Sequence, residues 1–137
     1  MLRVLVLLVA IAAASASITA RAPAQPAAHT IEITLVLSSQ PAVHPGRFTV
    51  SGAIADSGAA AQHALPHAAS LAGRVTLAGR RGTISLALFG VRTPADVDWA
   101  IVSGTGAYLG LHGAGTIVSR HVVAGATHEL LRGTVTR

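Results

Sequence analysis

Histidine is the residue type in this chain best suited to hold a metal ion or transfer a proton, and the chain has seven histidines. His121 and His128 flank Ala124-Gly125, a dipeptide typical of a tight turn, which predicts that they face each other across a β-hairpin. Cross-strand partners lie about 5 Å apart at Cβ, a spacing that could seat a zinc or copper ion. The other histidines are His29, His44, His63, His67 and His112.

Other features of the sequence argue against a metal site. His63 and His67 have the spacing of metal ligands on a helix, but Pro66 between them disfavours a regular helix. The chain has no cysteine, and Glu129 should point to the face opposite its neighbour His128. We therefore expect exposed histidines in loops and on strand faces, and no metal or other cofactor, with His121 and His128 as the candidate ligands if a metal binds.

The acidic residues do not form a recognisable catalytic set. Asp96 and Asp98 share a strand face near Trp99, but they follow Pro94 at a predicted strand start, where solvated acids are common. Asp56 is predicted to be a turn residue whose carboxylate accepts backbone hydrogen bonds. The chain has no Gly-x-Ser-x-Gly motif. The sequence leaves the catalytic and ligand-binding residues unassigned and does not favour an enzyme. The acids are Glu32, Asp56, Asp96, Asp98 and Glu129.

The segment 104–115 concentrates glycines around a single tyrosine, Tyr108. The glycines are not spaced as Gly-x-Gly-x-x-Gly and no helical pattern follows them, so a nucleotide site is not expected. Glycine permits positive φ and close backbone approach, which corners and bulges of a sheet require. We predict a structural hairpin in which the Tyr108 ring lies across one end of the fold, its hydroxyl reaching water or a backbone group. Its glycines are Gly104, Gly106, Gly110, Gly113 and Gly115.

Apolar residues alternate with other residues along most of the chain after position 30, which is the period of a β-strand. The run Ala59–Ala69 is ambiguous, and Gly58 and Pro66 favour a long loop over a short helix. Seven or eight short strands with close turns predict an all-β fold, an antiparallel eight-stranded barrel, with a β-sandwich as the alternative. The predicted strands cover 31–37, 48–55, 71–78, 83–88, 97–102, 116–123 and 131–135.

The N-terminus has the order of a secretory signal peptide. Arg3 precedes an apolar run that is too short for a membrane span of about 20 residues, and Ala14-Ser15-Ala16 offers a cleavage site. We expect a signal-peptide helix within residues 1–16, a flexible Ala/Pro-rich leader over 17–30, and one barrel domain over 31–137. The protein is then secreted or otherwise extracytoplasmic.

Composition limits what the charge can mean. Every basic residue is arginine, and lysine, asparagine and cysteine are absent, as in proteins of GC-rich genomes such as those of actinobacteria. The net charge of +5 is therefore weak evidence about partners. The arginines are scattered and aromatic residues are few, so we expect no nucleic-acid partner.

Three segments carry a resemblance to a known group of proteins. Residues 101–115, with the motif Gly-Thr-Gly-x-Tyr-x-Gly, resemble the glycine-rich hairpin of the allene oxide cyclase and dirigent barrels. Residues 48–58 and 79–86 resemble small secreted bacterial proteins of that group. The resemblance implies an eight-stranded antiparallel barrel, packed into trimers in the plant members. No catalytic residue of the plant enzymes can be placed on this chain.

Three functions remain open. The first is a secreted non-catalytic barrel that binds a small apolar ligand or acts as an envelope or matrix component. The alternatives are a dirigent- or cyclase-like enzyme steering a reactive intermediate, and an exported metal-binding protein. Inward positions should offer such an enzyme almost no ionisable groups.

The strand around Trp99 also predicts assembly. It is apolar on both faces, with Ala100 and Val102 on the side away from Trp99. Two apolar faces require cover on both sides. We expect a homo-oligomer, with a trimer the leading choice, unless the segment Ala59–Ala69 provides that cover.

Overall fold

The computed structural model describes residues 22–40, 45–64, 73–90 and 97–137. The predicted signal peptide and the sequence positions of His44, His67 and Asp96 lie outside the described residues.

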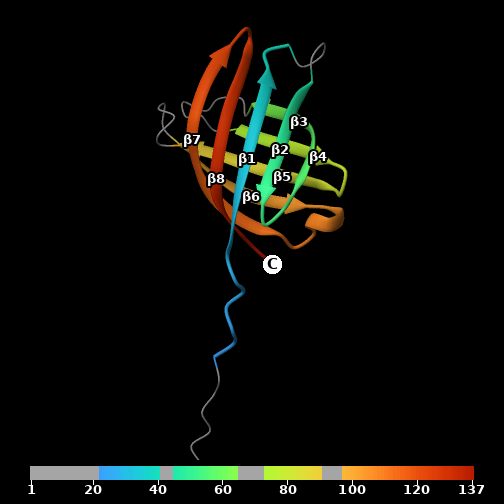
Figure 1. Cartoon of the computed structure of the whole chain (residues 1–137), viewed down its shortest axis with the longest axis vertical. Coiled ribbons are helices and arrows are strands. Elements are labelled where there is room, and N and C mark those ends of the chain that lie inside the picture. The colour runs from blue at the N-terminus through green and yellow to red at the C-terminus, as the bar shows by residue number, and fades with distance from the viewer. Residues whose placement is uncertain (1–21, 41–44, 65–72, 91–96) are drawn as a thin grey trace, which may run out of the picture.

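The described chain forms a closed barrel of eight antiparallel strands, each paired with its neighbours in sequence and β1 paired with β8 (Figure 1). This confirms the predicted all-β barrel over a sandwich. The connection between β6 and β7 contains a short 3-10 helix, η2, at Gly106–Tyr108. The strands are β1 His29–Ser38, β2 Gly46–Gly52, β3 Asp56–Ala64, β4 Gly73–Gly79, β5 Thr83–Gly90, β6 Val97–Gly104, β7 His112–Val123 and β8 Ala126–Thr136.

Alternate residues of the strands fill the interior. In β1 every second residue from Ile31 to Leu37 is buried, and Leu131 and Val135 of β8 continue the same core. Trp99 is fully buried, and its ring reaches so close to Gly133 that a Cβ there would lie 2.6 Å from Cζ2 of the ring. Trp99 therefore packs directly against the backbone of β8 at this level of the interior.

The alanine-rich segment differs from the sequence prediction. Ala59 and Ala60 belong to strand β3, which pairs with both β2 and β4, so the predicted long loop over this part of the segment is wrong. Asp56 begins β3 and does not lie in a turn. Alanine has a low strand propensity, but pairing on both edges satisfies the backbone of β3 and overrides it.

Two irregularities change which side chains face inward. A β-bulge between Ser85 and Leu86 of β5 leaves Val102 of β6 without a register partner. A second bulge in β7 leaves Val118 unpaired, between the partners Ile117↔Leu131 and Ser119↔Leu130. An extra residue reverses the side-chain alternation beyond it.

The glycine-rich connection is tightly packed at Gly106. This residue has φ +59°, and a Cβ on it would lie 2.5 Å from the carbonyl oxygen of Arg81. Ala107 donates a backbone hydrogen bond to the same oxygen at 2.8 Å. Gly106 thus lets η2 dock against the turn between β4 and β5.

We predict that Gly106→Val destabilises the barrel by more than the roughly 1–3 kcal/mol cost of a strained backbone, because it adds a steric clash. Gly110→Val is the matched control: its φ is +73°, but a Cβ there meets no atom within 4 Å. Urea unfolding of both variants should show the larger loss for Gly106→Val. Equal losses of stability in the two variants would show that the steric clash contributes nothing. If Gly106→Val unfolds at the same urea concentration as the wild type, the close packing of Gly106 against Arg81 is contradicted.

Candidate functional site at the two ends of the barrel

At one end of the barrel, a hydrogen bond between Tyr108 and Asp56 links the β6–β7 connection to the start of β3. The Tyr108 side chain is buried, and its hydroxyl donates to Oδ2 of Asp56 at 2.5 Å. The same carboxylate accepts backbone N–H groups from Ser57, Arg80 and Arg81 at 2.8, 3.2 and 3.3 Å. Three separate parts of the chain therefore meet at one carboxylate.

The electrostatics of this bond favour a fixed protonation state. The Tyr108 hydrogen bond, aided by the backbone donors, lowers the pKa of Asp56 to about 2. Burial and the adjacent Asp56 carboxylate raise the pKa of Tyr108 to about 12. Neither group changes charge near neutral pH, so this hydrogen-bonded arrangement suits a structural role better than proton transfer.

The hydrogen bonds of Asp56 and Tyr108 agree only in part with the sequence prediction. Asp56 does accept backbone hydrogen bonds, as predicted, although it does so from the start of a strand. Tyr108 lies at the end of the barrel, but its partner is this carboxylate and not water or a backbone group. A single sequence shows no signal linking two residues 52 positions apart.

The interior near the other end holds a buried carboxylate, Glu129. Its side chain is 1% exposed, and its position in β8 alternates with those of Leu131 and Val135, so it faces the core. Its register partners are Leu35 of β1 and Arg120 of β7. A carboxylate on this inward face is costly unless its charge and its hydrogen-bonding capacity are met.

Arg120 forms an ion pair with Glu129 and offsets its negative charge. Its Nε lies 3.0 Å from Oε1 of Glu129, and its side chain is 25% exposed, so it runs from the interior toward solvent. The orientation falls short of a hydrogen bond, and neither oxygen of Glu129 accepts one from the described residues. Burial raises the pKa of Glu129 and Arg120 opposes that rise, with burial the larger effect.

This ion pair is the exception in an interior that otherwise has almost no ionisable groups among the described residues, as expected. Glu129 could have been found by extending the alternation of Leu131, Gly133 and Val135 by one step. The inward facing of Arg120 could not be predicted from alternation, because the bulge at Val118 reverses the alternation of β7. Sequence periodicity carries no reliable sign of such a bulge.

A third interior polar atom, Nε1 of Trp99, also has no hydrogen-bond partner among the described residues. The Trp99 ring packs at Gly133, four residues from Glu129 along β8. Four residues of strand span about 13 Å, so Trp99 and Glu129 lie at different levels of the interior.

The remaining candidate residues lie on the surface. Glu32 accepts a hydrogen bond from Arg132 at 2.7 Å, and Asp98 is exposed. His29, His63 and His112 are exposed on separate strands. His121 and His128 are register partners, as predicted, and their rings stack on the outer face. No group of three or more potential metal ligands occurs within the described chain.

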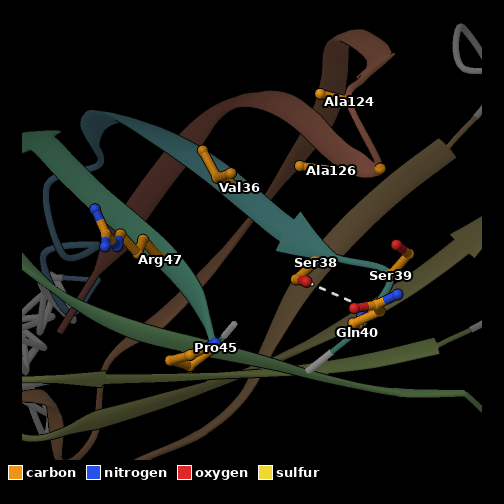
Figure 2. Close-up of a pocket in the computed structure, with 9 residues that line it drawn as sticks. Val36, Ser38, Ser39, Gln40, Pro45, Arg47, Ala124 and Ala126 are labelled. Carbon is orange, nitrogen blue, oxygen red and sulfur yellow. Dashed lines mark hydrogen bonds between the residues drawn. The ribbon is translucent and has the colours of Figure 1, made fainter. Parts of the chain in front are cut away.

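A groove of about 540 Å³ lies where the β7–β8 turn approaches β1 and β2. Figure 2 shows Arg47 on one side of this groove and Gln40 and Ser39 on the other, with Val36 between them. Ser38 accepts a hydrogen bond from the Gln40 backbone at 3.0 Å. Val36 and Arg47 are register partners on the outer face, so the groove is separate from the interior ion pair.

The chain matches no protein-family model, no curated protein and no solved structure. Its resemblance to the allene oxide cyclase and dirigent barrels thus stays a prediction. Among the described residues, no helix has the length and apolar character needed to cross a membrane.

Proposed function

We propose that this protein is exported and acts as a non-catalytic binding barrel for a small, mostly apolar molecule that carries a hydroxyl group. The observation that carries the proposal is Glu129, a buried carboxylate with two oxygens that no described residue supplies with a hydrogen bond. Export is supported by the charge, apolar run and small residues of 1–16.

The surroundings of Glu129 determine the ligand chemistry. Glu129 and Arg120 offset each other in charge, so a neutral ligand fits better than an ion. A hydroxyl group would donate to the free carboxylate oxygen and relieve the cost of leaving it unpaired. Leu35 is the cross-strand neighbour of Glu129, and Phe48 is the next residue in that row. Both are buried, and they offer an apolar wall to the rest of the ligand.

Trp99 provides the experiment, because it is the only tryptophan of the chain and lies in the same interior. Titration with 1-hexanol should change the Trp99 fluorescence saturably, with hexanoate and hexylamine binding more weakly. Glu129→Leu should weaken the hexanol interaction at least tenfold because it removes the hydrogen-bond acceptor. Glu129→Gln keeps an acceptor of similar shape and should retain part of the binding.

The matched control is Glu32→Gln, which removes an acid of the outer surface. It should bind hexanol as the wild type does. A fluorescence change that does not saturate, or unchanged binding by Glu129→Leu, would contradict the proposal. Circular dichroism of each variant verifies that the barrel is folded.

A cyclase- or dirigent-like enzyme is the second candidate, and Glu129 favours it too. Burial raises the pKa of this carboxyl group although Arg120 opposes the rise, and a carboxyl group with a raised pKa suits general acid catalysis. Turnover of a reactive substrate that is lost in Glu129→Gln, where binding is retained, would favour the enzyme over the binding protein.

We also infer a homo-oligomer, with a trimer the leading choice, from the outer face of β5, β6 and β7. Ala87, Ala100 and Ala114 form one cross-strand row there. Phe89 and Val102 on the same side are 46% and 49% exposed. The segment Ala59–Ala69 was the other candidate to cover this face. Its described part, Ala59–Ala64, belongs to the barrel wall as part of β3.

Light scattering tests this assembly. The mature protein should have about three times the monomer mass, and Val102→Asp should shift it toward the monomer by placing a charge in the contact. Thr49→Asp on the exposed face of β2 is the control and should not change the mass. A wild-type monomer at high protein concentration would contradict the assembly.

A further inference from the structure

The β7–β8 hairpin brings two imidazole rings together on the outside of the barrel. His121 and His128 are register partners, with ring centroids 5.4 Å apart and ring planes within 6° of parallel. Their strand neighbours Arg120 and Glu129 face the interior, so both rings face outward. His121 is exposed and His128 half-buried, which leaves the pair accessible to an ion from solution.

The spacing of the two rings is close to that of two histidines on one metal ion. Imidazole nitrogens bind such ions at about 2.0–2.1 Å, which puts the centroids of two adjacent ligand rings about 5 Å apart. The observed separation fits such a site, but the two ring planes are nearly parallel, so both side chains must rotate to turn one nitrogen of each ring toward the ion. The strands that carry the rings pair from Ser119↔Leu130 to Val123↔Ala126 around the turn, so the backbone already holds both residues in place.

We propose that His121 and His128 form a binding site for a divalent transition-metal ion, with Cu²⁺ bound more tightly than Ni²⁺ or Zn²⁺. Imidazole is a good ligand for all three ions, and N-donor sites generally bind copper most strongly. The described residues provide two ligands, so water occupies the other coordination positions.

The residues beside His121 and His128 on the outer face determine which other ligands the ion can have. Val36 of β1 is the other register partner of His128, and Arg47 of β2 follows Val36 in the same row. The row thus adds no carboxylate ligand, and the positive charge of Arg47 opposes cation binding, so the two imidazoles must supply the binding energy. The site binds one ion, and it is independent of the interior ligand proposed for Glu129.

Copper binding to the mature protein tests the site. We expect one Cu²⁺ per chain, an electron paramagnetic resonance spectrum with nitrogen ligands, and a higher melting temperature with Cu²⁺, because the ion links β7 to β8. His121→Ala and His128→Ala should each weaken binding at least tenfold and lose the temperature shift.

His112→Ala is the matched control, since His112 is an exposed histidine of β7 whose register partner is Thr136. It should retain wild-type affinity and the full temperature shift. Equal losses in all three variants, or none in His121→Ala and His128→Ala, would overturn the site. One Cu²⁺ shared by two chains would also overturn it, because the ligands would then come from different molecules. Melting without metal shows that each variant is folded.

Discussion

Closure of the sheet is the constraint on which the other features of this barrel depend. Pairing of β1 with β8 leaves no open edge, so each strand has a neighbour on both sides and alternate side chains are committed to the interior. This accounts for the buried row from Ile31 to Leu37, for the strand formed by an alanine-rich segment, and for the burial of Glu129. The bulge at Val118 then sends Arg120 inward beside Glu129 and leaves the two histidines outside.

The two ends of the barrel use acidic residues in opposite ways. Asp56 receives four hydrogen bonds, from Tyr108 and three backbone groups, and these keep its pKa low and join distant segments. Glu129 receives none from the described residues, and burial raises its pKa. Fully satisfied polar groups specify structure, whereas an unsatisfied buried group requires another explanation. On this contrast we assign a structural role to Asp56 and propose Glu129 as the site of ligand binding.

Alternation of apolar residues predicted an all-β fold and most of its strands. The turn at Ala124-Gly125 predicted that His121 and His128 face each other. The candidate site depended on features that alternation does not encode. A bulge reversed the facing of Arg120, and tertiary pairing made a strand of residues with low strand propensity. The bond between Asp56 and Tyr108 joins residues whose separation in sequence gives no local signal. Glu129 followed the rule of alternation, but as an acid among apolar residues it was not expected inside.

The central claim is that Glu129 ionises within the barrel interior, and the pH dependence of stability measures this directly. The folded-state pKa of Glu129 lies above its ordinary value of 4.5. Protonated Glu129 therefore contributes stability at pH values below 4.5, and this contribution is lost as pH rises through the folded-state pKa. The unfolding free energies of the wild type and Glu129→Gln should be compared in urea from pH 4 to pH 8. The account predicts that the wild type loses stability relative to Glu129→Gln as pH rises, until Glu129 is fully ionised. A difference that stays constant across this range would contradict it, because Glu129 would then titrate as a solvated carboxylate.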